Sequence, residues 1–458
     1  MNFRLTKGNF LKTGAYIEGD SAIFTFAAEK EDECSIVLLD KSGDTACVID
    51  IPAEYSTGSL YSVRLHGFCG NEYAYYFRIN GKRCIDPYAT RIFGREKWND
   101  KTRSDNDYEI ACGIDSSDFD WKYDSFPEIT RDRMKLYKLH VRGFSMDVSG
   151  NKKHKGTFEA VSDRINYIKK LGFTSILLMP VYEFEEMTIP VKHDIPEYAK
   201  PKYSLKDEQS VHTENDKVNF WGYTSGNYFA VKASYASDAS DASNELRRLV
   251  ERLHKNGMEC IVEMYFPDRT DHNLILDALR YWVMSFHVDG FKLLGDRLPV
   301  TAIVQDALLS RTKILYDGFD MSVVPQNRTY ENLYIDKEEY QFAARMMLNH
   351  INCNMYELLN QQKKQGENVG FINYISSNNG FTLSDLFMYN DRHNEANGEK
   401  NADGPSWNFS NNYGCEGPSR KRFIREIRKL KWKDAMLLLF LAQGVPMIMA
   451  GDEICNSQ

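Results

Sequence analysis

Over the first part of the chain, apolar and polar residues alternate in short runs separated by turn residues. The runs are rich in β-branched and aromatic residues, a composition that favours strands. They lie at residues 22–27, 35–39, 46–51, 61–65 and 73–79. Asn80-Gly81 has the composition of a two-residue hairpin loop. The pattern predicts a β-sandwich over residues 1–120.

From residue 134 the pattern changes, because apolar runs now alternate with stretches of helical periodicity. The expected strands lie at residues 136–144, 175–181, 258–266, 290–294, 313–316, 369–375 and 445–449. The expected helices lie at residues 157–171, 245–256, 274–287, 302–310, 338–351 and 420–442. Residues 319–336 are poorly patterned, so the sixth strand is not placed. Near-continuous apolar strands alternating with helices predict a (β/α)8 barrel of the TIM type over residues 134–458, ending at or just after its last strand.

Composition narrows the classes of function. A net charge of −8 argues against binding to nucleic acid or to anionic membrane surfaces. The start of the chain lacks the apolar segment of a signal peptide, and the longest apolar run, 435–450, is interrupted by polar and proline residues. Nine widely spaced cysteines without a C-x-x-C pair indicate free thiols, so a cytoplasmic location is expected. No spacing typical of a metal site and no glycine-rich phosphate loop is present, so neither a metal nor a cofactor is expected.

The segment 373–418 is polar and rich in Asn, Asp and Gly, and it follows the apolar run at 369–375. A buried strand that leads into such a loop is typical of the active face of a β/α barrel. The segment contains GFTL (380–383), HNEANGE (393–399), Trp407-Asn408 and Glu416-Gly417-Pro418. In these motifs it resembles the isoamylase and glycogen-debranching branch of the α-amylase superfamily, glycoside hydrolase family thirteen. The resemblance covers nearly the whole chain, and Asp86-Pro87-Tyr88-Ala89 resembles the exit from the starch-binding-type sandwich of that branch.

The resemblance implies an O-glycosyl hydrolase that cleaves α-1,6 branches, and it assigns three catalytic positions. Retaining hydrolysis needs a nucleophilic carboxylate and an acid that protonates the leaving oxygen. The nucleophile position after the fourth strand holds Leu294, which offers no lone pair. The acid position after the fifth strand holds Asp317, one methylene shorter than the glutamate of the family. The position of the third carboxylate, after the seventh strand, holds Asn379.

Further positions of the family's sugar site have also changed. Lys292 stands where the family has an arginine, and Asn378 where it has a histidine. At the third strand, Glu263 and Asp268 occupy positions of the family's Asp-x-x-x-Asn-His pattern. His393 and Asn394 either line the cleft or belong to a loop held by its own side-chain bonds.

Two aromatic residues, Trp221 and Tyr223, are candidates for stacking on glucose or for packing at the barrel rim. Most of the other aromatic residues are expected in the core.

Three functions remain open at this point. The first is an isoamylase-like protein of α-glucan metabolism with impaired or no catalysis, which binds glycogen, amylopectin or maltooligosaccharides, or a partner enzyme of glycogen metabolism. The second is an active α-1,6-glucosidase that uses Asp317 as the acid with Asp296 or Glu263 rearranged. The third is a structural or regulatory subunit that binds no sugar.

Overall fold

The computed structural model divides the chain by its contacts into two compact units, residues 1–120 with 182–246 and residues 121–181 with 247–458. The described residues are 3–68, 70, 72–100, 110–116, 118–146, 154–187, 218–320, 331–366, 368–397, 401–405 and 407–457. The segment 182–246, which the sequence placed within the barrel domain, belongs to the first unit.

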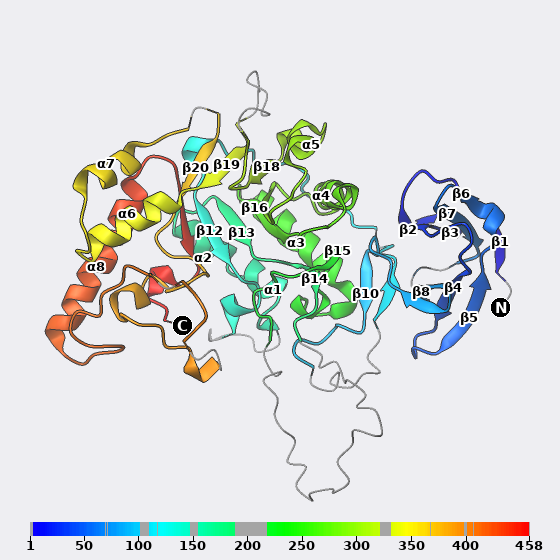
Figure 1. Ribbon diagram of the computed structural model, residues 1–458, viewed down its shortest axis with the longest axis horizontal. Helices are drawn as coiled ribbons and strands as arrows, with labels where there is room; N and C mark the ends of the chain where they lie inside the picture. The colour runs from blue at the N-terminus through cyan, green and yellow to red at the C-terminus, as the bar shows by residue number, and fades with distance from the viewer. Residues whose placement is uncertain are drawn as a thin grey trace, which may run out of the picture. The chain divides into compact units, whose positions relative to one another are not determined.

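Two antiparallel sheets form the larger part of the first unit (Figure 1). One sheet has the order β1-β7-β3-β2, with β6 beside β7. Its strands are β1 (Arg4–Lys7), β2 (Gly14–Glu18), β3 (Ser21–Ala27), β6 (Ser56–Thr57) and β7 (Leu60–His66). The other has the order β10-β11-β8-β4-β5, with β9 beside β8. Its strands are β4 (Cys34–Leu39), β5 (Thr45–Asp50), β8 (Ala74–Ile79), β9 (Lys82–Cys84), β10 (Arg91–Phe93) and β11 (Ala111–Gly113).

Aromatic side chains from both sheets fill the core between them. Phe26 of β3 stacks on Phe77 of β8 with ring centroids 4.2 Å apart. Phe24 meets the edge of Tyr75 at 5.0 Å. The pairing of these buried rings holds the two sheets face to face, and it confirms the predicted sandwich.

The segment after residue 181 adds a hairpin and a turn to the first unit. Strands β14 (Tyr182–Phe184) and β15 (Gly226–Val231) pair in antiparallel fashion, and two 3₁₀-helices follow, η7 (Ala233–Tyr235) and η8 (Ala239–Asp241). Most of the charged loop that the sequence predicts at 183–218 lies outside the described residues. Glu183 and Glu186, at the start of this loop, pair with the fully buried Lys232 at 2.8 Å and 2.9 Å. These two ion pairs compensate the ammonium charge of Lys232, whose burial without a partner would be strongly destabilising.

The second unit is a closed barrel of eight parallel strands (Figure 1), which confirms the predicted fold class. The strands are β12 (Leu136–Leu139), β13 (Ser175–Leu178), β16 (Glu259–Tyr265), β17 (Gly290–Leu294), β18 (Lys313–Leu315), β19 (Leu333–Asp336), β20 (Gly370–Asn373) and β21 (Val445–Met449). The barrel closes where β12 pairs with β21, with Leu136 opposite Met447. The sixth strand, β19, which the sequence left unplaced, has four residues and ends at Asp336.

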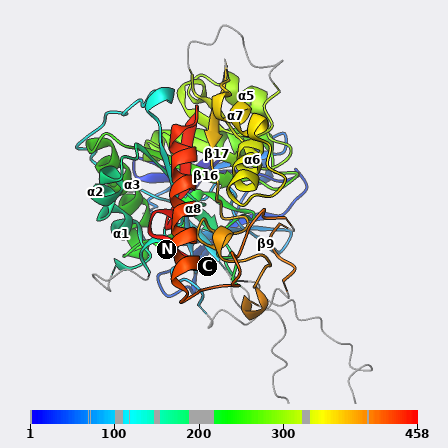
Figure 2. The ribbon, with the colours of Figure 1, turned by 90° about the vertical axis from the view of Figure 1, so that its left-hand side faces the viewer.

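Helices connect these strands on the outside of the barrel, and α8 runs along its surface (Figure 2). They are α1 (Phe158–Ser162), α2 (Ile165–Lys170), α3 (Ala242–Lys255), α4 (His272–Phe286), α5 (Val300–Gln305), α6 (Glu338–Leu348), α7 (Met355–Lys363) and α8 (Arg422–Leu441). The single helix that the sequence predicts at 157–171 is two helices, because the backbone at Arg164 (φ −101°, ψ 1°) leaves the helical region. The helix predicted at 302–310 is α5 followed by the 3₁₀-helix η9 (Leu309–Arg311).

Two findings bear on the predicted environment of the chain. The eight cysteines within the described residues are free thiols, and Cys69 lies outside them. Among the described helices none is both long and apolar enough to cross a membrane.

Candidate active site

The interior of the barrel changes from apolar to charged along its axis. Its apolar part is one buried cluster with members from seven of the eight strands, together with Met134, two residues before β12. The cluster contains Met134, Leu136, Leu177, Ile261, Leu315, Tyr334, Ile372, Val445 and Met447. Successive inward positions on a strand lie two residues apart, so the next inward residues are Lys138 on β12, Glu263 on β16 and Asp336 on β19. These residues form a charged layer toward the carboxyl ends of the strands, where active sites of such barrels lie.

The first ion pair of this layer joins two strands that are not neighbours. Lys138 Nζ lies 2.7 Å from Glu263 Oε1, although β13 separates β12 from β16. Both side chains are buried, and Lys138 Nζ also donates to Asn378 Oδ1 at 2.7 Å. Burial lowers the pKa of Lys138, although the neighbouring Glu263 acts to raise it. The pair therefore spans the interior of the barrel and ties it to the loop after β20.

A second ion pair has the same arrangement three strands farther around the barrel. Lys292 on β17 pairs with Asp336 at the end of β19, with β18 between them. Burial acts to lower the pKa of Lys292, but the carboxylates of Asp336 and Glu263 outweigh it and raise that pKa. Glu263 and Lys292 are also direct partners in the register of β16 and β17, so the two ion pairs form one network.

Asp317, at the family's acid position, lies at the exposed edge of this network. Its Oδ1 accepts a hydrogen bond from the backbone N–H of Asp336 at 3.1 Å. Partial burial and the neighbouring Asp336 carboxylate raise the pKa of Asp317. A carboxyl group with a raised pKa is suited to proton donation, and Asp317 forms no ion pair with the residues that the structure describes.

The other two positions that the resemblance assigns to catalysis carry no acid. Leu294 is the last residue of β17, and its half-buried side chain has no lone pair to offer an anomeric carbon. The strand does not continue to Asp296, because Gly295 adopts φ 138° and Asp296 is exposed beyond it. Asn379 is exposed in the loop after β20, where its backbone N–H donates to Ser377 Oγ at 3.3 Å.

The Asn- and Gly-rich segment 373–418 is anchored to α6 by a buried arginine. Arg345 Nε donates to the carbonyl of Ile375 at 2.6 Å, and Nη1 donates to the carbonyl of Asn408 at 3.4 Å. Burial lowers the pKa of Arg345 to about 10. Gly380 of the GFTL motif has φ 105°, and a Cβ there would lie 2.8 Å from Asn408 Oδ1, so only glycine fits.

Two carboxylates hold the rest of this segment. Glu416 accepts hydrogen bonds from His393, the side chain of Asn412 and the backbone of Asn390 and Asp391. Burial acts to raise the pKa of Glu416, but these four donors outweigh it and lower the pKa to about 2. Asn394 is bound within the same loop, with its N–H on Asn401 Oδ1 at 2.7 Å. His393 and Asn394 thus make the loop-stabilising bonds that were one of their two predicted roles.

The second carboxylate is Asp452, after the last strand. It is buried and accepts hydrogen bonds from Ser376 Oγ, from the N–H of Leu383 at 3.1 Å and from the N–H of Met449 at 3.0 Å. Burial raises the pKa of Asp452 to about 6. It joins the segment after β20 to the end of β21.

The remaining predicted residues are spread over both units. Asp268 is exposed after β16 in the barrel unit. Trp221 and Tyr223 belong to the first unit, where Trp221 contacts Phe220 with ring centroids 5.1 Å apart. The barrel itself brings together Lys292, Glu263, Asn378 and Asp317.

Two residues of the network were not singled out from the sequence. Lys138 stands at an inward position of the first strand, two residues after Leu136, and a lysine in a strand buried on both faces is a signal that could have been used. Asp336 ends a strand that the sequence did not place.

Comparisons with known proteins agree with this architecture. The family model for the α-amylase catalytic domain matches residues 148–272. Isoamylase 1 of Arabidopsis thaliana is 27% identical over 86% of this chain and 60% of its own length. The glycogen debranching enzyme of Enterobacter sp. (strain 638) is 25% identical over 99% of this chain and 79% of its own length. The chain thus spans about 60% of the length of the Arabidopsis isoamylase.

Among solved structures, the catalytic module of the glycogen-degrading pneumococcal virulence factor SpuA in complex with an inhibitor has a TM-score of 0.68. It is 18% identical, and the match covers 98% of this chain and 71% of that module. The closed barrel, the motifs of the segment 373–418 and these relatives lead to one conclusion. By sequence and by fold, the chain is similar to the isoamylases and glycogen-debranching enzymes of the α-amylase superfamily.

Proposed function

We propose that this protein binds α-glucans such as glycogen, amylopectin or maltooligosaccharides, and that its barrel does not hydrolyse them by the retaining mechanism. The observation that carries the proposal is the charged network at the barrel mouth. Leu294 stands at the nucleophile position, and the buried carboxylates of Glu263 and Asp336 are each paired with a lysine.

Retaining hydrolysis requires a carboxylate that is free to attack, with a second carboxyl group about 5 Å away. Glu263 is fully buried and held by Lys138 at 2.7 Å, so its rearrangement toward a sugar would leave Lys138 charged and unpaired in the interior. Asp296 lies beyond Gly295 and is exposed. These contacts favour the non-catalytic function over the active glucosidase with rearranged carboxylates.

The charges at the barrel mouth also argue against hydrolysis. The transition state of glycoside hydrolysis carries positive charge on the sugar ring. The mouth contains two buried ammonium groups, and Asn379 replaces the carboxylate that would support the ring. An amide is uncharged and cannot stabilise that positive charge as a carboxylate does.

Binding of a sugar requires hydrogen-bonding groups at the mouth but no pair of catalytic carboxylates. Asn378 and Asn379 offer amide donors and acceptors at the mouth, Asp317 and Asp268 are exposed carboxylates, and the segment 373–418 is held in place by Arg345 and Glu416. A glycogen debranching enzyme is similar in sequence to this chain, and a mutant pullulanase from Paenibacillus barengoltzii complexed with maltotetraose is similar in fold. These observations favour α-glucan binding over a subunit that binds no sugar. Free thiols support a reducing compartment such as the cytoplasm.

The first test measures release of reducing ends from glycogen and from pullulan by the purified chain. We expect no turnover above the level of Asp317→Ala, with Asp163→Asn, an exposed carboxylate after α1, as the matched control. Turnover by the parent chain that Asp317→Ala abolishes would refute the non-catalytic function.

The second test measures migration of the folded chain in native gels with and without glycogen. We expect retardation by glycogen and a weaker effect in Asn378→Ala, whose side chain lies at the mouth. Unaltered migration of the parent chain would leave the subunit without sugar binding as the remaining function.

A further inference from the structure

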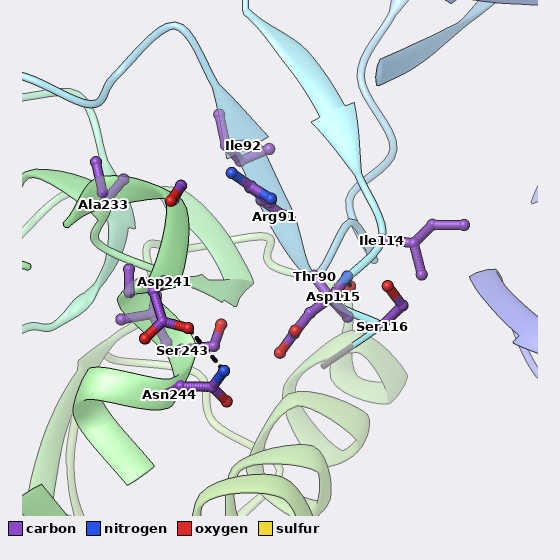
Figure 3. A pocket seen from close by; sticks show the side chains of 14 residues that line it. Thr90, Arg91, Ile92, Ile114, Asp115, Ser116, Ala233, Asp241, Ser243 and Asn244 are labelled. Atoms are coloured by element: carbon purple, nitrogen blue, oxygen red, sulfur yellow. Dashed lines mark hydrogen bonds between the residues drawn. The ribbon is translucent and has the colours of Figure 1, made fainter. Parts of the chain in front are cut away.

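The polar groups around a small pocket in the first unit are bound to one another (Figure 3). Asn244 Nδ2 donates to Asp241 Oδ1 at 2.7 Å, and the backbone N–H of Asp115 donates to Thr90 Oγ1 at 2.7 Å. Among the described side chains that line this pocket, none has a buried nitrogen or oxygen without a hydrogen-bond partner. The pocket therefore holds no unsatisfied group that points to a ligand.

The outer face of α8, in the second unit, carries large apolar side chains that are exposed to solvent. The exposed fractions are 73% for Phe423, 56% for Leu430, 58% for Leu437 and 76% for Leu441. Apolar residues that are scattered singly over a surface are normal, whereas a contiguous exposed group of them marks an interaction site. These four lie on a single helix of the barrel unit.

The other faces of α8 are firmly packed in the second unit, along whose surface the helix runs (Figure 2). Its buried residues are Ile424, Ala435 and Leu439. Trp432 Nε1 donates to the carbonyl of Asp452 at 2.7 Å, and Arg428 Nη1 donates to the carbonyl of Gly417 at 2.7 Å. The exposed apolar face is therefore held in a fixed position on a rigid helix.

The spacing of this face is that of a coiled-coil seam. The positions involved are Phe423, Ile427, Leu430, Asp434, Leu437 and Leu441, which we call the α8 seam. Successive members alternate between four and three residues apart, which is the heptad spacing that interlocks with a second helix. Ile427 and Asp434 are half-buried, and the other four members are exposed. At a rise of 1.5 Å per residue the seam is about 27 Å long, so it matches a helix of about five turns.

Basic side chains flank the α8 seam. Residues 420–434 contain eight Lys and Arg but two acidic residues, although the net charge of the whole chain is −8. Arg422, Lys429 and Lys433 recur at helical spacing along one edge of the seam and are exposed. They form no ion pair with the residues that the structure describes. A partner with acidic residues at the facing positions would complement this edge.

Two other occupants fit the α8 seam less well. A second copy of this chain would bring a second basic edge to the interface, and like charges would then oppose association. An anionic membrane surface would attract the basic edge, but membrane-bound helices present a wide apolar face. The α8 seam is narrow and contains the carboxylate of Asp434, and the chain as a whole is acidic.

We propose that the α8 seam docks one amphipathic helix of a partner protein, with apolar residues along its own seam and acidic residues at its flanks. The acidic residues would pair with Arg422, Lys429 and Lys433, as residues beside the seam do in coiled coils. One basic residue in the partner's seam would face Asp434 and set the register. None of these positions belongs to the charged network of the barrel mouth, so the inference is independent of sugar binding there.

The test is fluorescence anisotropy of a labelled synthetic peptide of about three heptads, titrated with the folded full chain at pH 7. The acidic peptide has leucines along its seam, glutamates at its flanks and one lysine at the central seam position. The second peptide is identical except that lysines replace the flanking glutamates. We expect saturable binding of the acidic peptide and at least about tenfold weaker binding of the basic one.

Variants at exposed positions show where the peptide binds. Leu430→Glu places a charge in the α8 seam and should weaken binding of the acidic peptide about tenfold or more, since burial of one leucine contributes at this level. Lys429→Glu combined with Lys433→Glu should weaken binding of the acidic peptide and strengthen binding of the basic one. Met284→Glu, at a 62% exposed position of α4, is the matched control and should change affinity less than about twofold. Thermal unfolding midpoints equal to that of the parent chain show that the variants are folded.

The remaining outcomes overturn the proposal. They include absence of acidic-peptide binding to the parent chain, and equal binding by Leu430→Glu and Met284→Glu. Sedimentation that shows a dimer of the parent chain, and a monomer of Leu430→Glu, would assign the face to a second copy. Flotation of the parent chain with phosphatidylserine vesicles, lost in Leu430→Glu, would assign it to a membrane surface. Retardation by glycogen in native gels should be the same for the parent chain and Leu430→Glu, so failure of this proposal is distinct from failure of the proposed function.

Discussion

The ion pair between Lys138 and Glu263 allows a quantitative test of the charged network. Lys138→Met keeps the length of the side chain but leaves the fully buried Glu263 carboxylate without its partner at 2.7 Å. Loss of one member of a buried ion pair costs roughly 3–5 kcal/mol. Lys292 also acts on Glu263 through space, so the lower end, about 3 kcal/mol, is expected. At roughly 2–4 °C per kcal/mol, the unfolding midpoint should fall by about 6–12 °C.

Calorimetry at pH 7 measures this change, with Arg252→Met as the matched control. Arg252 pairs with Glu159 at 3.0 Å on the surface of the same unit, where a pair contributes about 0–1 kcal/mol. Lys138→Met combined with Glu263→Gln removes the unpaired charge and should recover much of the loss. The reasoning is refuted if Lys138→Met is no more damaging than Arg252→Met, or if the double variant is as unstable as the single one.

Three further predictions concern charged groups around the mouth and, for Asp86, beside Tyr75 of the sandwich. Arg345→Met leaves the carbonyls of Ile375 and Asn408 without their buried donor. The free energy of unfolding should fall by about 2 kcal/mol, and amide exchange over 375–390 should become faster. Unchanged exchange would contradict the anchoring role of Arg345. Glu416 has a folded pKa of about 2, below the usual value of about 4.3, so its stabilising effect is present above about pH 4 and is lost as the pH falls toward 2. The difference in midpoint between the parent chain and Glu416→Gln should therefore vanish at low pH, and a constant difference would argue against it. Burial raises the pKa of both Asp86 and Asp452 to about 6, so the stability that they contribute is present below about pH 4 and is lost as the pH rises through 6. Asp86→Asn and Asp452→Asn should each flatten the fall in midpoint over this range, and an undiminished slope in both would refute the assignment.

The sequence by itself determined the architecture, because periodicity records which faces of an element are buried. Short alternating runs gave the sandwich, and seven of the eight barrel strands lie where apolar runs predicted them. The motifs of the segment 373–418 indicated the resemblance to the family, and that resemblance assigned the expected catalytic positions to residues 294, 317 and 379. These inferences depend only on the order of residues along each strand and loop.

Only the tertiary structure decided what occupies the barrel mouth. Lys138 and Glu263 are far apart in the chain and on strands that do not pair, so their contact follows from closure of the barrel and not from local pattern. The same holds for Lys292 on β17 and Asp336 on β19, which also do not pair with each other and are separated by β18. Local sequence encodes which residues face inward, whereas the register and curvature of the closed sheet fix which inward charges meet.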